Sequence, residues 1–284
     1  MHVSEVLDLS ADFAAMVDPE PPEVWLVAPP SDAWLRRRGH GFGASDMANV
    51  LVALGYRSDD VLSSSQKKKN TQPRRKGIPR VHRVFLEKAG LVAPLKVNLD
   101  PDSPIQLGSE REPELVRQWT EKIRRGTAGP DCALLDWEAV TYVEGEWPRE
   151  VLPLVDREAP RLTATPDTLV RSIFGRLEAW DAKCSMRPYG DLTHEQIAAG
   201  VTPLREHHRI QVHSQMAVCS AERGGIVEGE GWSARFRDLS GVPCGPIVSR
   251  GMDRSEDLIL ELRAASVEGW ARVEEARAAY RLAA

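Results

Sequence analysis

The sequence predicts a single α/β domain with a mixed central β-sheet flanked by helices. Three observations support this prediction. Helical patterns come first, strand-like segments follow, and a further helix, more strands and a long C-terminal helix complete the order. The length of 284 residues is enough to bury a full core. No internal repeat divides the chain, so one domain over residues 1–284 is expected, with residues 1–32 as an N-terminal extension and residues 33–284 as its core.

Three helices are expected in the first half of the chain, and each ends at a glycine. They cover residues 45–54, 80–89 and 109–125. Ser45 opens the first, and Pro113 lies in the first turn of the third, where its missing N–H costs nothing. Glycine after a helix tolerates the left-handed conformation that ends it.

Strand-like segments rich in β-branched and apolar residues follow. They cover residues 134–143, 161–167, 168–174 and 176–183. A helix over residues 204–219 comes next, followed by strand-like sequence over residues 231–239 and 246–251. The chain closes with an amphipathic helix over residues 255–280.

The composition and the N-terminal residues favour a cytoplasmic protein. No apolar run approaches the roughly 20 residues that cross a bilayer, and the acidic N-terminus lacks the pattern of a secretion signal. The four cysteines contain no CxxC pair, which argues against a zinc ribbon and predicts free thiols: they are Cys132, Cys184, Cys219 and Cys244.

A net charge of −5 does not by itself indicate a nucleic-acid-binding protein, but the basic residues are unevenly distributed. Residues 61–86 contain no acid and eight basic residues: Lys67, Lys68, Lys69, Arg74, Arg75, Lys76, Arg80 and Arg83. Runs of this kind are often solvated loops. The alternative is an arm that binds the phosphates of a nucleic acid.

Two acids and a lysine stand where the pattern predicts the middle of a sheet. Side chains alternate along a strand, so Asp181 and Lys183 point to the same face, whereas Glu178 points to the other. Asp167 ends the preceding strand-like segment, and a hairpin could bring it beside Asp181. Burying two carboxylates together is costly unless cations compensate. Lys183 supplies one positive charge, and oxygen ligands suit Mg²⁺ or Mn²⁺ for the remainder.

A third acid lies on the apolar face of a predicted helix. Glu112 shares that face with Val116, Trp119 and Ile123. One explanation is a partly solvated carboxylate near the positive end of the helix dipole. The other is a metal site shared with Asp167 and Asp181, and the unexplained acids together favour it.

These residues resemble the PD-(D/E)xK nuclease superfamily, and most fully its phage lambda exonuclease and YqaJ-like viral recombinase branch. "TPD" and "DAK" match the superfamily signature. "RRRGHGFGASDMANVL", "QLGSEREPELVRQW", "WDAKCS" and "RIQVHSQMAV" are similar to four motifs of that branch and occur in its order, from about Trp34 to Val218. The C-terminal helix with Trp270 is similar too.

The resemblance implies a restriction-endonuclease-like fold and a Mg²⁺-dependent or Mn²⁺-dependent deoxyribonuclease with two ions. Asp167, Asp181, Glu112 and the Ala182 carbonyl would be the metal ligands. Lys183 would orient or activate the attacking water, and Gln211 would support the site. Three residues depart from the family pattern. Thr168 stands where glycine is common, Asp181 replaces the usual glutamate, and His208 stands where relatives often carry tyrosine. None of these removes a needed functional group.

The glycine-rich turn "RGHGFGAS" is a second candidate site, because backbone N–H groups before a helix can bind an anion. The resemblance implies that Arg38 and Ser45 contact the terminal phosphate of DNA. The simpler explanation is an ordinary helix start with Ser45 as its N-cap.

The resemblance further implies 5′–3′ exonuclease activity on the ends of linear double-stranded DNA in phage-type recombination. It also implies a homotrimer and a single-strand annealing protein as partner. Two alternatives remain: an endonuclease of the same superfamily in restriction or repair, and a non-catalytic DNA-binding module. The intact Asp–Ala–Lys sequence argues against the second alternative.

Overall fold

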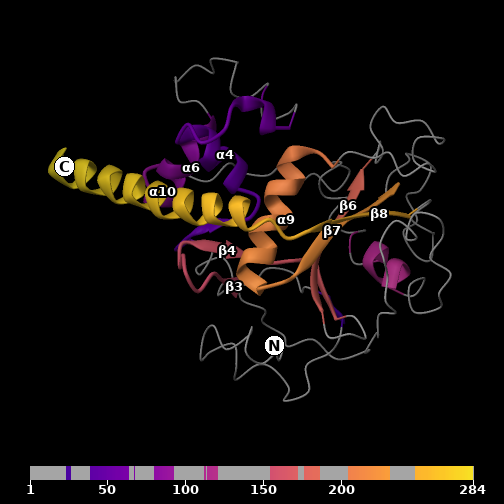
Figure 1. The fold of residues 1–284 in the computed structure, drawn as a ribbon. Coiled ribbons are helices and arrows are strands. Elements are labelled where there is room, and N and C mark those ends of the chain that lie inside the picture. The colour runs from indigo at the N-terminus through magenta and orange to yellow at the C-terminus, as the bar shows by residue number, and fades with distance from the viewer. Residues whose placement is uncertain are drawn as a thin grey trace.

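The fold is α/β, with mixed sheets and flanking helices, as predicted. The computed structural model describes residues 24–26, 39–63, 67, 80–92, 112, 114–120, 154–171, 176–185, 204–230 and 247–283. Its main sheet has the strand order β1-β5-β6-β7-β8, and Figure 1 shows β6, β7 and β8 beside helix α9. The bounds are Val24–Leu26 for β1, Thr168–Arg171 for β5, Leu177–Ser185 for β6, Arg223–Glu230 for β7 and Ile247–Asp253 for β8.

A smaller sheet has the order β2-β4-β3, formed by Phe42–Gly43, Leu162–Ala164 and Leu154–Val155 respectively. β2 pairs parallel with β4, whereas β3 pairs antiparallel with it. β4 is followed within a few residues by β5, so one continuous stretch of chain links the two sheets.

Helix α9, Glu206–Cys219, is the crossover between β6 and β7, the parallel pair of the main sheet. Parallel strands cannot be joined by a tight turn, which explains why the chain makes a helix here. Ten of its residues are buried, including Ile210, Val212 and Met216. Figure 1 shows α9 packed across β6 and β7, so it covers the sheet over its middle strands.

Three further helices pack together around Phe42. They are α4 (Met47–Ala53), α6 (Arg80–Ala89) and α10 (Glu256–Ala283). The Phe42 ring makes edge-to-face contacts with Phe85 of α6 and Trp270 of α10, at centroid distances of 5.9 and 5.8 Å. Such aromatic pairs add to the stability that burial provides. A short 3₁₀ turn, η1 (Asp59–Val61), follows α4.

A helical segment at residues 112 and 114–120 packs against β6 through two tryptophans. The ring centroids of Trp119 and Trp180 lie 4.9 Å apart, and both side chains are buried. Gly225 on β7 makes room for this pair, because a Cβ there would lie 2.2 Å from the Trp180 ring. Trp180 alternates with Asp181 along the strand, so this helical segment and α9 pack on opposite faces of β6.

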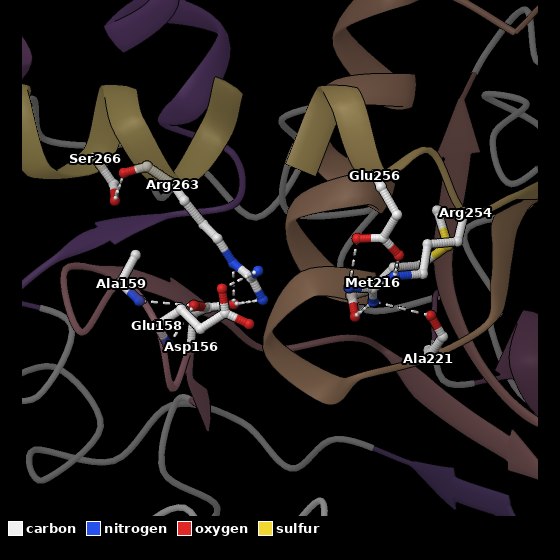
Figure 2. A network of polar contacts seen from close by, with 9 residues as sticks. All are labelled: Asp156, Glu158, Ala159, Met216, Ala221, Arg254, Glu256, Arg263 and Ser266. Atoms are coloured by element: carbon white, nitrogen blue, oxygen red, sulfur yellow. Dashed lines mark hydrogen bonds and ion pairs between the residues drawn. The ribbon is translucent and has the colours of Figure 1, made fainter. Parts of the chain in front are cut away.

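Two arginines fasten α10 to the rest of the fold, as Figure 2 shows. Arg263 forms an ion pair at 3.0 Å with Asp156, whose side chain is fully buried. The other oxygen of that carboxylate accepts the backbone N–H groups of Glu158 and Ala159. Arg254, just before α10, donates to the Met216 carbonyl at the end of α9. The C-terminal helix is therefore tied to both the small sheet and α9.

Several boundaries match the predictions, and one is wrong. Gly55 and Gly90 have φ values of +79° and +77°, the left-handed conformation expected where α4 and α6 end. Ser45 does not cap α4: the N-cap is Asp46, whose carboxylate accepts the Gly43 N–H at 3.0 Å.

Strand β1 lies in the predicted N-terminal extension, where no strand was expected, and pairs with β5. The strand-like residues 134–143 and 231–239 lie outside the described residues. No helix in the described parts of the chain is long and apolar enough to span a membrane.

Candidate active site

The hairpin of β5 and β6 brings Asp167 beside Asp181. Thr168 pairs with Trp180 in antiparallel register, so the residue before β5 faces the residue after Trp180. The Ala182 N–H donates to Oδ2 of Asp167 at 2.7 Å and fixes that carboxylate against β6. The sequence argument for a hairpin therefore describes the actual arrangement.

The Lys183 ammonium lies among the acids. It forms an ion pair with Asp181, lies 4.0 Å from Oδ2 of Asp167 and donates to the Ala182 carbonyl at 2.9 Å. Asp181 and Lys183 point to the same face, as the strand alternation requires. The ammonium thus binds three of the groups that the family resemblance assigns to a metal.

Helix α9 supplies two amides to Asp181. Nε2 of Gln211 lies 3.0 Å from both carboxylate oxygens, and Nε2 of Gln215, one turn later, donates to Oδ1 at 2.9 Å. Asp181 is only 2% exposed, so these donors replace the water that would otherwise solvate it. Gln211 was predicted to support the site. The contact of Gln215 was not predicted, although the two residues share a helix face.

Glu112 approaches the same group of charges from the helical segment that packs on Trp180. Val116 and Trp119 of that segment are buried, which places the predicted apolar stripe toward the core. Glu112 itself is partly buried, and its carboxyl interacts with the charges of Lys183 and Asp181. The structure therefore brings Glu112 together with the other candidate site residues.

Burial and mutual repulsion dominate the electrostatics of this cluster. Burial raises the pKa of Asp167 well above its ordinary value, Asp181 raises it further, and Lys183 opposes the rise. Burial also raises the pKa of Glu112. Burial would lower the pKa of Lys183, but Asp181, Asp167 and Glu112 together raise it. Three carboxylates around one ammonium leave an excess of negative charge.

The chemistry of these oxygen donors, rather than their present arrangement, suits a hard divalent cation. Among the described residues, no three acidic, histidine or cysteine groups converge into a ready metal-binding arrangement. The Lys183 ammonium is the cation that contacts the Asp181 carboxylate and the Ala182 carbonyl in this structure. Carboxylate and carbonyl oxygens are the ligands that Mg²⁺ and Mn²⁺ prefer, and a cation would relieve the repulsion that raises the carboxyl pKa values.

The glycine-rich turn leaves the small sheet beside the segment that leads from β4 to Asp167. β2 runs parallel to β4, with Gly43 opposite Thr163, so Ser45 follows β2 at the same sheet edge where residues 165–167 follow β4. Ser45 is exposed there. Arg38 lies outside the described residues, and so do Lys68, Lys69, Arg74 and Arg75; Lys67 is helical and partly buried.

A buried ion pair next to the cluster was missed in the sequence. Arg250 of β8 and Glu228 of β7 lie 2.8 Å apart between Nη2 and Oε2. In the sequence, both residues look like ordinary solvent-facing charges on alternating strands. The pairing of β6, β7 and β8 places them on the sheet face that α9 covers. No local signal in the sequence distinguishes them from ordinary surface charges.

Comparison with solved structures identifies the fold. No protein family matches the chain, and no curated protein sequence matches it. The alkaline exonuclease LHK-Exo from Laribacter hongkongensis is 18% identical with a TM-score of 0.52, over 88% of this chain and 96% of that chain. Its complex with dAMP is 19% identical with a TM-score of 0.50, over 89% and 99%. The fold is thus of the restriction-endonuclease-like type found in that nuclease. Identities this low show a shared fold and leave the activity to be argued from the site.

Proposed function

We propose that this protein is a metal-dependent 5′–3′ exonuclease that hydrolyses the phosphodiester bonds of linear double-stranded DNA in phage-type recombination. The observation that carries the proposal is that Asp167, Asp181 and Lys183 lie together at the β5–β6 hairpin, where the charge of Glu112 also acts. The likeness of the fold to an alkaline exonuclease supports it. So does the agreement of four ordered motifs with the lambda exonuclease and YqaJ-like branch.

Each group has a role that phosphodiester hydrolysis needs. Asp167, Asp181, Glu112 and the Ala182 carbonyl would hold Mg²⁺ or Mn²⁺, with two ions as the family resemblance implies. Bound there, the ions supply charge that neutralises the phosphate oxygens and lowers the pKa of water. Lys183 would then point its ammonium at the attacking water or the scissile phosphate. Gln211 and Gln215 hold the Asp181 carboxylate in one orientation, which keeps its ligand geometry fixed.

DNA contacts are proposed at two places. Arg38 and Ser45 would bind the terminal phosphate, because Ser45 is exposed at the sheet edge that also leads to Asp167. The basic residues Lys67, Lys68, Lys69, Arg74 and Arg75 would contact backbone phosphates without regard to sequence. A homotrimer and a single-strand annealing protein are proposed from the family resemblance alone.

Purified protein tested on matched DNA substrates distinguishes this function from its alternatives. We expect Mg²⁺-dependent release of nucleotides from end-labelled linear duplex DNA and no cleavage of covalently closed circles. Cleavage of circles would instead indicate an endonuclease. Binding without cleavage in Mg²⁺ or Mn²⁺ would indicate a DNA-binding module. The order in which labels are released from 5′ and 3′ ends gives the polarity.

A further inference from the structure

A second pair of opposite charges is buried beside Lys183. Glu228 is 4% exposed and Arg250 is 8% exposed. Nη2 and Oε2 are 2.8 Å apart, yet their directions do not form a hydrogen bond. Among the described residues, neither of these two atoms nor Nε of Arg250 has a hydrogen-bond partner. The contact therefore rests on charge rather than on directed hydrogen bonds.

The strand register places this pair on the same face as the site. Glu228 of β7 is the direct neighbour of Lys183 on β6. Arg250 of β8 is opposite Ile226, which is in turn the neighbour of Asp181. Side chains of neighbouring residues on paired strands point to the same face, so Glu228 stands next to Lys183 under α9.

This placement gives Lys183 two competing partners. Its ammonium is held by Asp181, but Glu228 presents a second buried carboxylate from the adjacent strand. Burial raises the pKa of Glu228, and Arg250, then Arg205 and Lys183, oppose that rise. Arg205 is exposed at the N-cap of α9, so water screens its charge. Arg250 is therefore the cation that neutralises Glu228 directly.

We propose that Arg250 is a positioning residue of the nuclease site: by pairing with Glu228, it keeps that carboxylate from drawing the Lys183 ammonium away from Asp181. The proposal rests on the proposed nuclease function. A buried carboxylate that loses its partner seeks another cation, because an unpaired buried charge is strongly unfavourable. Lys183 is the neighbouring cation on the same face, and its displacement would misplace the group that acts on the water or phosphate.

The test combines three variants. Arg250→Met should lower kcat on linear DNA about tenfold or more with little change in KM, since only the geometry of Lys183 changes. Glu228→Gln alone leaves no carboxylate that could attract Lys183, so kcat should fall less than about threefold even though the unpaired Arg250 guanidinium lowers Tm. The double variant, Glu228→Gln with Arg250→Met, should recover kcat to within about threefold of wild type, because no unpaired carboxylate remains to attract Lys183. A merely structural role for Arg250 would lower Tm in the single variant and restore it in the double variant, but it would leave kcat per folded protein and the environment of Lys183 unchanged.

Arg223→Met is the matched control. Arg223 pairs with Asp253 across the same two strands at 3.2 Å, but at the other end of β7 from Glu228. This variant should leave kcat unchanged. If Arg250→Met does not fold, Arg250→Lys replaces it. Its shorter side chain weakens the pair, and the smaller loss must again be recovered by Glu228→Gln.

A spectroscopic readout separates this proposal from the nuclease assignment. The ¹⁵N–¹H signal of the Lys183 ammonium, assigned by its disappearance in Lys183→Arg, should shift in Arg250→Met and return in the double variant. A wild-type protein that cleaves no DNA would overturn the proposed function, whereas the signal would still report the position of Lys183. An unshifted signal, or a fall in kcat that Glu228→Gln does not recover in a folded double variant, would overturn the positioning role.

Discussion

The backbone N–H of Ala182 donates to the carboxylate of Asp167 at 2.7 Å, which joins the two halves of the candidate site through one hydrogen bond. Asp167 precedes the β5–β6 hairpin and Ala182 lies on its second strand. The bond leaves the Ala182 carbonyl to face the Lys183 ammonium at 2.9 Å. The same residue thus orients a carboxylate through its N–H and an ammonium through its C=O.

Removing either charge at the centre should abolish cleavage. Lys183→Ala and Asp167→Ala should each lower the cleavage rate at least ~100-fold while DNA binding persists, because the deleted groups act mainly on the transition state. Cleavage of end-labelled duplex and a binding titration without divalent ions measure the two effects. A variant that keeps near-normal hydrolysis would remove its residue from the mechanism.

Asp167→Asn should separate stability from activity. It removes a charge from a crowded group of carboxylates, and the amide oxygen can still accept the Ala182 N–H. We therefore expect a higher Tm than wild type in EDTA, together with loss of cleavage. Wild-type protein should gain Tm when Mg²⁺ is added, and Asp167→Asn should gain less. Equal gains in both proteins would argue against Asp167 as a metal ligand.

Gln215 should matter for activity more than for stability. Its Nε2 donates to Asp181, whereas its buried Oε1 has no hydrogen-bond partner among the described residues. Gln215→Leu fills a similar volume and should lower kcat or Mg²⁺ affinity about 10-fold to 100-fold, as removal of a residue that orients a ligand does. Ser214→Ala is the control, because the Ser214 hydroxyl donates to the Ile210 carbonyl within α9. Equal activities of the two variants would contradict the role of Gln215.

The Arg263–Asp156 pair should anchor α10. The Asp156 side chain is fully buried, so Arg263→Leu leaves an uncompensated carboxylate and should destabilise the protein by about 3–5 kcal/mol. Urea unfolding measures this loss, and adding Asp156→Asn should recover part of it. Arg272→Leu breaks an exposed pair with Glu275 on the same helix and should cost at most about 1 kcal/mol. Similar losses for both arginines would refute the anchoring role of Asp156.

Local patterns predicted the elements of the site well. Strand alternation placed Asp181 and Lys183 on one face, and the apolar stripe of Val116 and Trp119 turned its helix toward the core. Both patterns depend on residues close in the sequence, where one period decides the direction of a side chain. The family resemblance predicted that Gln211 supports the site, and the structure adds the partner, the Asp181 carboxylate.

Relations between distant segments could not be predicted in this way. Glu228 and Arg250 acquire their roles from the register of β6, β7 and β8. The cap of α4 was assigned to Ser45 because serine is a common N-cap, yet the carboxylate of Asp46 turns back to the Gly43 N–H instead. Competition between two adjacent capping residues depends on the loop geometry that the small sheet imposes.

Neutralising Lys67, Lys68 and Lys69 to glutamine should weaken DNA binding equally for all sequences. Each phosphate that the variant no longer neutralises should reduce the slope of log K against log salt by about 0.9 for duplex DNA. Fluorescence anisotropy at several salt concentrations measures the slope. Neutralising Arg272 and Arg281, both exposed on α10, is the control and should change it less. An unchanged slope in the lysine variant would identify the run as a solvated loop.

Under the proposed function, the terminal phosphate should govern how the protein selects an end. If Arg38 and the turn over residues 41–45 bind that phosphate, duplexes with a 5′-phosphate should be digested faster than duplexes with a 5′-hydroxyl. A guanidinium can bind a phosphate through two parallel charge-assisted hydrogen bonds, which an ammonium cannot reproduce. Arg38→Lys should therefore recover only part of the preference, and Arg38→Ala should slow phosphorylated ends while leaving hydroxyl ends nearly unchanged.

Initial rates on the two end types decide whether this selection resides at Arg38. Measured for wild type, Arg38→Lys and Arg38→Ala, the ratio of phosphate to hydroxyl rates should fall in that order. Ser45→Ala should lower the same ratio, because the exposed hydroxyl follows β2 at the sheet edge that leads to Asp167. The ratio isolates end recognition from catalysis, since a defect at the carboxylate cluster slows both substrates alike. Equal wild-type rates on both ends would remove the terminal-phosphate assignment and leave the nuclease assignment standing on the carboxylates and Lys183.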